Sequence, residues 1–315
     1  MIMRNFRVFG ARLAARSSAR LPHSIREAVF QTLCDKRGRN STFAQLAAEF
    51  HVVTMKVRGE YGDIQGNPRD LSILGTYAET GRWAERTNKQ LTSFFAERRG
   101  GTYLDIGANI GLTTIPIAQN PTVSCIAFEP EPGNYDNLVT NVATNCPHRN
   151  VETRRVALFS RKCSLPFEIA SENMGDHRIR LTDQPGLLYE DKRRTIEVEA
   201  VPLDDLALPI VDPLAVKIDT QGAEPFVIAG GERTIGRAEL LIMEFCPYML
   251  TRMAGDTELI FRLLESRFSR AGLAWKEGGN VGNPRPISEV IVDLRDIAAS
   301  KRNEPFYYLD IVAWK

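Results

Sequence analysis

The stretch Thr102–Gly111, which reads TYLDIGANIG, constrains the fold more than any other part of the chain. A short apolar run leads directly into a glycine-rich turn, and a helical pattern follows. Gly107 and Gly111 permit backbone conformations and close approaches that a Cβ atom would block, and the helix that begins here presents unpaired N–H groups. The stretch therefore predicts a strand, a tight turn and a helix N-terminus that bind a nucleotide-like cofactor.

Two carboxylates indicate which cofactor this turn favours. The spacing Gly-x-x-x-Gly differs from the Gly-x-Gly-x-x-Gly turn of dinucleotide-binding proteins, and Asp105 precedes the glycines, where it would oppose a pyrophosphate but attract an amino group or a sulfonium. Glu129 follows the next strand about 20 residues later, where a βαβ unit brings an acid to a ribose diol. Glu129 alone does not separate NAD from a sulfonium cofactor, but Asp105 and the glycine spacing favour the sulfonium.

Apolar runs and helical patterns alternate from Gly101 onward, which predicts a βαβ series and a mostly parallel sheet covered on both faces. The strand-like segment Pro286–Leu294 and the last strand are expected to form an antiparallel edge. Expected strands lie near 102–106, 123–128, 151–156, 214–219, 238–245 and 306–314, and expected helices near 111–118, 131–144, 223–236 and 256–271.

An insertion lies between the third and fourth of these strands. It carries two β-like runs, Cys163–Ile169 and Thr195–Val201, separated by the polar loop Ser171–Arg180. Loops of this length in compact domains often have a functional role. Arg178, Arg180 and the run 192–194 make the insertion locally basic, which indicates either a solvated face or a site for an acidic or sugar-phosphate acceptor.

Three motifs resemble those of the FkbM family of S-adenosylmethionine (SAM) dependent methyltransferases. They are the glycine turn, the segment IAFEPEP at 126–132 and the segment VKIDTQGAE at 216–224, and the resemblance extends from about Asp70 to the end of the chain. It implies an α/β, Rossmann-like class I SAM-dependent methyltransferase fold. Such a fold has a mostly parallel seven-stranded sheet with an antiparallel C-terminal edge and helices on both faces. The resemblance also implies SAM as the cofactor.

The resemblance further implies which residues hold SAM. The two acids and the turn would bind it, the end of the third strand would contact its adenine, and the segment before the turn would lie over it. Tyr77, Glu79 and Trp83 are the matching candidates in that last segment, and Trp83 is equally well interpreted as a core residue. The expected cofactor-binding residues are Asp105, Gly107, Ala108, Asn109, Gly111, Glu129, Pro130, Ala157 and Tyr77.

The segment Lys217–Glu224 supplies candidate catalytic groups. Lys217 lies within an otherwise apolar strand, and Asp219 falls at the carboxyl end of that strand, beside the crevice where open α/β sheets bind ligands. The resembled family commonly has Lys-Ile-Asp-x-Glu-Gly-x-Glu here, and Gln221 replaces the first of its glutamates. That replacement removes one negative charge and one candidate base.

Asp219 and Glu224 are therefore the expected positioning or proton-accepting groups. His177, in the polar loop, is a third candidate, with an isolated surface histidine as the alternative interpretation, and Glu244 is a further acid. A divalent metal needs several oxygen ligands, and the carboxylates Asp219, Glu224 and Glu244 lack a clear ligand spacing. No metal is therefore expected.

Methyl transfer from a sulfonium depends on placing the acceptor in line with the methyl group and, for a hydroxyl acceptor, on a base. We therefore expect an O-methyltransferase that acts on a hydroxyl of a small metabolite, a sugar or glycan, or a polyketide-type intermediate. An N-methyltransferase would use the same cofactor site. A non-catalytic SAM-binding scaffold is the alternative from a different functional class.

Composition gives little support to other partners. The formal net charge of +1 over 315 residues provides no general attraction to nucleic acid or to an anionic membrane. Five scattered cysteines without Cys-x-x-Cys spacing predict reduced thiols in the cytoplasm. No apolar run reaches the length of about 18 residues that a membrane-spanning helix needs.

Residues 1–69 are expected to form a basic, partly helical extension and cap, and residues 70–315 the methyltransferase domain. Residues 1–22 carry five arginines and no acidic residue. They predict a basic extension or a docked helix, with a transit peptide or a membrane-surface anchor as the alternative. Helices are expected over 24–34 and 41–50 and a strand over 51–58, and nothing in the sequence indicates the oligomeric state.

Overall fold

The computed structural model describes residues 22, 24–25, 47, 50–275 and 281–315. The basic segment 1–22 and the two helices expected before residue 51 therefore lie almost wholly outside the described residues. By its contacts the chain divides into two units. The first contains the residues up to Trp83 and the segment Ala170–Gly175, and the second contains Ala84–Ile169 and Asp176–Lys315.

The first unit contains a β-hairpin, β1 (Met55–Gly59) and β2 (Gly62–Gly66), in which the strands pair antiparallel. Helix α4 (Ile73–Thr80) follows, and the buried Asp70 carboxylate accepts backbone N–H groups at its start. The same carboxylate accepts the N–H of Met174, which ties the segment 170–175 to this unit. The division by contacts falls after Trp83, and the domain boundary expected after residue 69 stays a prediction.

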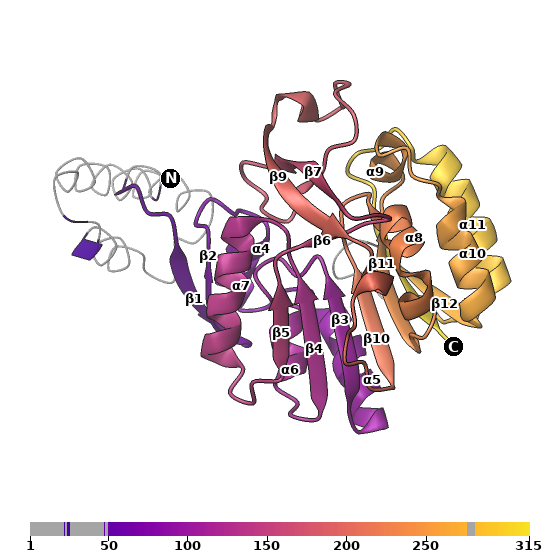
Figure 1. Ribbon diagram of the computed structural model, residues 1–315, viewed down its shortest axis with the longest axis horizontal. Helices are drawn as coiled ribbons and strands as arrows, with labels where there is room; N and C mark the ends of the chain where they lie inside the picture. Colours follow the sequence, from indigo (N-terminus) through magenta and orange to yellow (C-terminus); the bar gives the residue numbers. More distant parts are fainter. Residues whose placement is uncertain (1–21, 23, 26–46, 48–49, 276–280) are drawn as a thin grey trace, which may run out of the picture. The chain divides into compact units, whose positions relative to one another are not determined.

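The second unit is built on a mixed eight-stranded sheet. Its strands are β3 (Gly101–Ile106), β4 (Val123–Phe128), β5 (Val151–Arg154), β10 (Leu214–Ile218), β11 (Leu240–Phe245), β12 (Arg270–Trp275), β13 (Arg285–Pro286) and β14 (Leu309–Trp314). They lie in the order β13-β12-β14-β11-β10-β3-β4-β5, and the five from β11 to β5 are parallel (Figure 1). The Rossmann-like class I fold expected from the sequence is confirmed. The sheet has seven strands of four to six residues, and the two-residue β13 adds an eighth at one edge.

The C-terminal part of the sheet differs from the expectation in detail. Strand β14 is antiparallel to both of its neighbours, β11 and β12. The helix expected over 256–271 ends earlier, as α10 (Glu258–Arg267), and residues from Arg270 form β12. The strand expected at Pro286–Leu294 is wrong, because this segment begins helix α11 (Ile287–Ser300). Its buried residues Val290, Ile291 and Leu294 recur at helical spacing.

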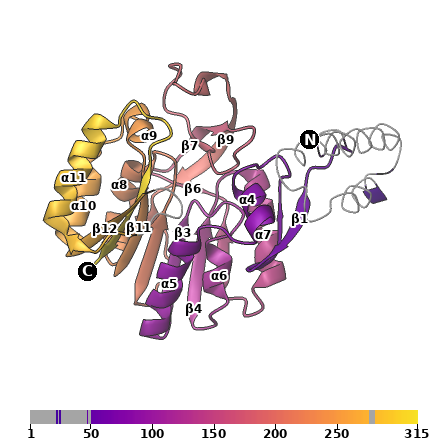
Figure 2. The same ribbon diagram turned by 180° about the vertical axis from the view of Figure 1, so that it is seen from behind.

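Helices cover both faces of the sheet. One group comprises α5 (Glu85–Arg98), α6 (Thr114–Ala118) and α7 (Pro132–Asn145), and α5 and α6 lie in front of the sheet in Figure 2. The other comprises α8 (Glu224–Ile235), α9 (Pro247–Arg252), α10 and α11, and α8 lies in front in Figure 1. Strands β3, β4, β10 and β11 are almost completely buried, as expected for parallel strands covered on both faces. Within the described ranges, no helix has the length and apolarity needed to cross a membrane.

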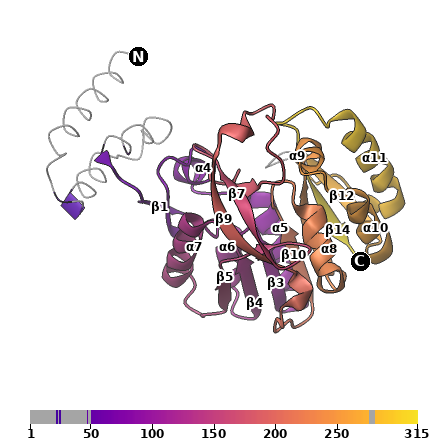
Figure 3. The same ribbon diagram turned by 45° about the horizontal axis from the view of Figure 1, so that its top comes forward.

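The insertion between β5 and β10 forms a second sheet, and its apolar core also includes Ala223 and Met253, beside α8 and α9. Its strands are β6 (Ala157–Leu158), β7 (Cys163–Ile169), β8 (Arg178–Ile179) and β9 (Arg194–Val201), in the order β6-β9-β7-β8, and two short 3-10 helices follow β8 and β9, η1 (Glu190–Lys192) and η2 (Leu203–Asp205). In Figures 1 and 3, β7 and β9 lie beyond the carboxyl ends of β3 and β4. The insertion is therefore placed next to the edge at which open α/β sheets bind ligands.

Candidate functional site

The glycine turn packs directly against the end of β10. Gly107 and Gly111 have positive φ values of 83° and 92°, a region that only glycine adopts without strain. A Cβ atom on Gly107 would lie 1.9 Å from the carbonyl oxygen of Asp219, and one on Gly111 would lie 2.8 Å from Leu138 Cδ1. The two glycines therefore allow the turn to approach both the neighbouring strand and α7, and they bring Asp219 next to the turn.

Asp105 lies beneath this turn and is completely buried. Its Oδ2 accepts hydrogen bonds from the hydroxyls of Thr113 and Thr114, at 2.7 and 2.6 Å. Its Oδ1 has no hydrogen-bond partner and lies 3.6 Å from Lys217 Nζ. Asp105 thus fixes the start of α6 against β3, a role that the sequence alone did not suggest.

Glu129 joins the two turns that follow β3 and β4. Its Oε2 accepts the N–H of Asn109 and its Oε1 accepts the N–H of Glu131, each at 2.9 Å. Burial raises the pKa of Glu129 to about 8, although the two N–H bonds act in the opposite direction. Each oxygen has a further lone pair that a hydroxyl could use. Pro130 and Asn109 beside it are only partly buried.

Two of the expected cofactor contacts have other surroundings. Tyr77 belongs to the first unit, where its hydroxyl donates to the Gly62 carbonyl and accepts the Tyr61 N–H, each at 3.0 Å. Ala157 was expected to end the third core strand, but β5 ends at Arg154 and Ala157 pairs with Ala200 in the sheet of the insertion. The contact of each residue with a cofactor stays a prediction.

Asp219 stands at the carboxyl end of β10, and its side chain is 37% exposed. Its Oδ2 lies 3.2 Å from Lys217 Nζ, and its Oδ1 accepts a hydrogen bond of 2.9 Å from the side-chain amide of Gln221. The same amide nitrogen donates to Glu244 Oε2 at 2.8 Å. Burial alone would lower the pKa of Lys217, but the charges of Asp219 and Asp105 raise it overall, so this lysine is a cation at neutral pH.

A third acid, Asp310, completes this group, and the sequence reasoning missed it. Asp310 lies on β14 directly opposite Glu244 on β11. Burial, followed by the charge of Asp219, raises the pKa of Asp310 to about 7 and raises the pKa of Glu244 well above its ordinary range. The sequence did offer a signal for Asp310, because it is the acid within the otherwise apolar run Leu309–Trp314. We refer to Asp219, Glu244 and Asp310 as the carboxylate cluster.

Glu224 lies on the first turn of α8 and is almost completely buried. Its Oε1 accepts the backbone N–H groups of Thr220 and Gly222, at 2.9 and 3.3 Å, and the Thr220 hydroxyl at 3.0 Å. Burial raises its pKa, although these N–H bonds lower it. These contacts order the loop that carries Gln221, and the catalytic role expected for Glu224 stays a prediction.

His177 is buried, so the alternative interpretation of it as a surface histidine is wrong. Its ring packs edge-on against Phe167, with the ring centres 6.5 Å apart. Burial, followed by the charges of Arg193, Arg194 and Arg178, lowers the pKa of His177 to about 4. The imidazole is therefore neutral at pH 7, and its role in catalysis stays a prediction.

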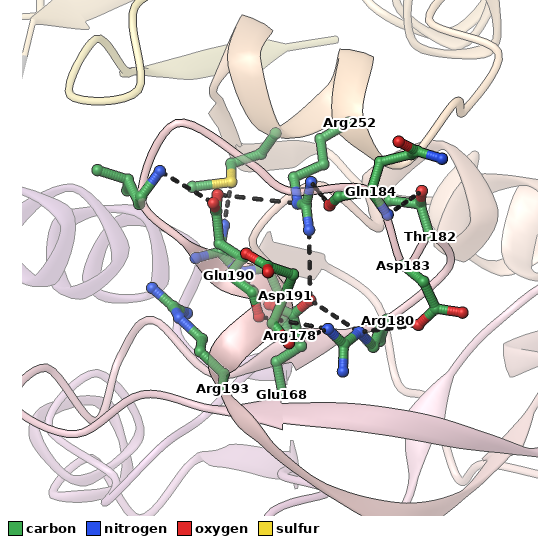
Figure 4. A network of polar contacts seen from close by, with 12 residues as sticks. Glu168, Arg178, Arg180, Thr182, Asp183, Gln184, Glu190, Asp191, Arg193 and Arg252 are labelled. Atoms are coloured by element: carbon green, nitrogen blue, oxygen red, sulfur yellow. Dashed lines mark hydrogen bonds and ion pairs between the residues drawn. The ribbon is translucent and has the colours of Figure 1, made fainter.

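A largely buried arginine network joins the insertion to α9. It consists of Glu168, Asp176, Arg178, Arg180, Glu190, Arg193 and Arg252, and Figure 4 labels all of these except Asp176. Arg178 lies 3.6 Å from Glu168 and 2.8 Å from Asp176, and its side chain is 1% exposed. Arg252, on α9, lies 3.7 Å from both Glu168 and Glu190. The basic character expected of the insertion is thus largely compensated by acids inside it.

No group of three or more His, Cys, Asp or Glu side chains in the described part of the chain is arranged to hold a metal ion. The carboxylate cluster instead contacts Lys217 and the neutral amide of Gln221.

Comparison with known families decides what this arrangement is. The model of the methyltransferase FkbM domain matches residues 105–271, which is more than half of the chain. The chain belongs to the FkbM methyltransferase family. Its members use SAM, so SAM is the cofactor of this methyltransferase domain, and the matched range includes the glycine turn, Glu129 and the carboxyl end of β10.

Solved structures add distant likenesses. A precorrin-6y C5,15-methyltransferase from Geobacter metallireducens is 15% identical, with 74% of this chain and 88% of that one covered and a TM-score of 0.36. An O-methyltransferase from Bacillus cereus, solved with SAH, is 12% identical, with 73% and 81% covered and a TM-score of 0.38. These TM-scores lie below 0.5, so neither structure decides the acceptor of this FkbM domain. No curated protein sequence matches the chain significantly.

The residues at the carboxyl edge fit SAM. Each Glu129 oxygen accepts one N–H and keeps a lone pair for a ribose hydroxyl, and Gly107 and Asn109 are accessible beside it. The carboxylate cluster favours a cationic ligand, because Lys217 is the basic side chain that the structure, in its described part, places within ion-pair distance of it. When bound, SAM supplies a methyl group on a positively charged sulfur.

Proposed function

We propose that this FkbM-family enzyme transfers the methyl group of SAM to a hydroxyl, with Asp219 as the base. One observation carries the proposal: the partly exposed Asp219 carboxylate stands directly beside the glycine turn, whose Gly107 has no room for a Cβ atom against the Asp219 carbonyl. A proton acceptor is therefore adjacent to the part of the fold that binds the cofactor, which is the placement that a hydroxyl acceptor requires.

The cofactor site in this proposal comprises the turn from Gly107 through Ala108 and Asn109 to Gly111, together with Glu129 and Pro130. Glu129 holds the ribose through hydrogen bonds to its two carboxyl oxygens. Asp105 supports this site indirectly, because its contacts with Thr113 and Thr114 keep the first turn of α6 in place.

Asp219 orients the acceptor hydroxyl and takes its proton. Lys217 holds one oxygen of Asp219 and Gln221 holds the other, so the carboxylate is fixed before an acceptor arrives. Glu224 maintains the intervening loop. We infer a small-molecule or glycan acceptor, because the site lies at the edge of the sheet under a compact insertion. A cytoplasmic location stays an expectation from the scattered cysteines.

Two substitutions separate binding from chemistry. Glu129→Ala removes two hydrogen bonds to the ribose, each of about 0.5–1.5 kcal/mol, so we expect SAM affinity to fall roughly tenfold in calorimetric titration. Asp219→Asn keeps the size but removes the base, so we expect turnover to fall by about 10²–10⁴ while SAM affinity changes far less. Methyl-labelled SAM and a cell extract fractionated by size and charge would supply the acceptor and the assay.

Asp205→Asn, at an exposed position at the end of η2, is the matched control and should leave both quantities unchanged. Label on nitrogen in the product would identify an N-methyltransferase. SAM binding without transfer to any fraction would support a scaffold. Wild-type turnover in Asp219→Asn would remove Asp219 from the role of base.

A further inference from the structure

The loop between β10 and α8 holds Gln221 in an unfavourable backbone conformation. Gln221 has a φ of 55°, a left-handed value that non-glycine residues adopt at a cost. Glu224 accepts N–H groups from the residues on either side, Thr220 and Gly222, and Gly222 packs so closely on Met249 that a Cβ atom would lie 2.9 Å from it. The surrounding contacts therefore force Gln221 into this conformation.

The conformation aims the Gln221 amide between two carboxylates. Its Nε2 donates at 2.9 Å to Asp219 and at 2.8 Å to Glu244, which uses both hydrogens of the amide. A neutral donor thus occupies the position between two acids that a proton or a cation would otherwise fill. Because both acids accept from it, the amide links their side chains across the loop.

Further titratable groups lie around this pair and its lysine. Asp105 comes from β3, Lys217 from β10, Glu224 from α8 and Asp310 from β14, and the Cys246 thiol follows Glu244 at the end of β11. Lys217 is the cation among these groups. An added negative charge at position 221 would therefore meet five carboxyl groups, those of Asp105, Asp219, Glu224, Glu244 and Asp310, and one ammonium group.

We propose that Gln221 is a positioning residue of the methyl transfer, whose amide holds Asp219 and Glu244 together and so orients Asp219 as the proton acceptor. The inference rests on the proposed role of Asp219 as the base. In that step the acceptor O–H bond breaks, its proton passes to Asp219, and its electron pair stays on the oxygen. That oxygen then forms the bond to the methyl carbon as the carbon–sulfur bond breaks and its electrons pass to sulfur.

The resembled family's common glutamate at this position provides the test variant. Gln221→Glu has the same size, removes the donor and places a third carboxylate between Asp219 and Glu244. We expect the acid limb of the pH–rate profile for single-turnover methyl transfer to move up by about one pH unit or more. The rate at pH 7 should fall about tenfold or more and recover toward the wild-type rate near pH 9.

Carbon-13 NMR of labelled Glu244 and Asp310 carboxyls gives a readout that does not depend on turnover. Both titrations should move to higher pH in Gln221→Glu. Gln221→Met, which removes the hydrogen bonds without adding charge, should lower the rate with a smaller movement of the limb. Gln119→Glu, at the exposed C-terminus of α6, is the matched control and should leave the profile and both titrations in place.

A rate loss of the same factor at every pH would overturn the inference, because a merely structural role of Gln221 predicts that result. Unmoved carboxyl titrations would overturn it as well. The Asp219→Asn variant separates this failure from that of the proposed function. If Asp219→Asn loses turnover but Gln221→Glu shows no movement, Asp219 remains the base and only the role of Gln221 fails.

Discussion

The carboxylate cluster and the arginine network are two dense groups of charge in the same unit, and they are balanced in opposite ways. The cluster gathers Asp219, Glu244 and Asp310 around one lysine, so acidic groups outnumber basic ones. In the arginine network acids and arginines alternate, and each arginine contacts at least one acid of the network. The cluster is also partly exposed, with 37% of the Asp219 side chain accessible, whereas Arg178 is sealed at 1%.

This difference in charge balance distinguishes a candidate reaction site from a structural ion-pair network. An uncompensated charge near a crevice is costly to the folded protein and is useful only if a ligand or a reaction relieves it. A buried charge that is already paired needs no ligand. Its ion pairs instead connect the strands and helices that carry the paired residues. The arginine network joins β7, β8, η1 and α9 and so holds the insertion over the sheet.

Removing one arginine from the network should cause the largest change in stability. Arg178→Met should lower the free energy of unfolding by about 3–5 kcal/mol, because it removes from Glu168 and Asp176 the most deeply buried of their arginine partners. Urea denaturation measures the loss. Arg161→Met, at an exposed arginine on the turn before β7, is the control and should change stability by about 0.5 kcal/mol or less. A loss below 1 kcal/mol in Arg178→Met would mean that the network does not support the fold.

Removing one acid from the carboxylate cluster should instead raise the free energy of unfolding. The pKa of Asp310 is raised to about 7, so its ionisation costs the folded state stability as pH rises from about 4 through 7. Asp310→Asn cannot ionise and should gain about 1–3 kcal/mol over the wild type at pH 8, with no gain at pH 4. Asp296→Asn, on the exposed side of α11, should show no such pH dependence. A variant less stable than the wild type at pH 8 would show that Asp310 is fully compensated.

The smallest expected effect is a change in the pH dependence of stability at His177, which lies beside the arginines of the insertion. Burial and the neighbouring arginines lower the pKa of His177 to about 4, so the wild type loses stability as pH falls from about 6.5 toward 4. His177→Phe lacks this loss, and at pH 5.5 the difference should be about 1 kcal/mol relative to pH 7.5. Thermal unfolding at the two pH values measures it, with the exposed His148→Phe as control. Equal acid sensitivity in wild type and His177→Phe would contradict the assigned pKa shift.

The parts of the fold that sequence predicted well are those in which neighbouring residues carry the whole signal. The run from Thr102 to Gly111 contains its own strand, turn and helix start, so its position followed directly. Helix α11 also had a readable signal, because Val290, Ile291 and Leu294 repeat at helical spacing, but its apolar composition was taken for a strand. The short apolar run of β12 fits a strand or a helix end equally well.

The candidate site could be predicted only where it follows the chain. Asp219 and Glu224 lie in one motif, but their different roles depend on contacts that spacing does not give: Glu224 turns inward to order the loop, and Asp219 stays accessible. Asp310 joins the site only because β14 returns beside β11, a long-range pairing that no local pattern encodes.

That return of β14 also bears on how the protein is made. Because β14 pairs on one side with β11 and on the other with β12, both neighbours emerge from the ribosome before the strand that belongs between them. Until residues 309–314 have been synthesised, the edges of β11 and β12 that will face β14 lack their partner, and open edges of this kind pair readily with other chains. The acid that completes the carboxylate cluster, Asp310, therefore arrives only with the last of these strands to be synthesised.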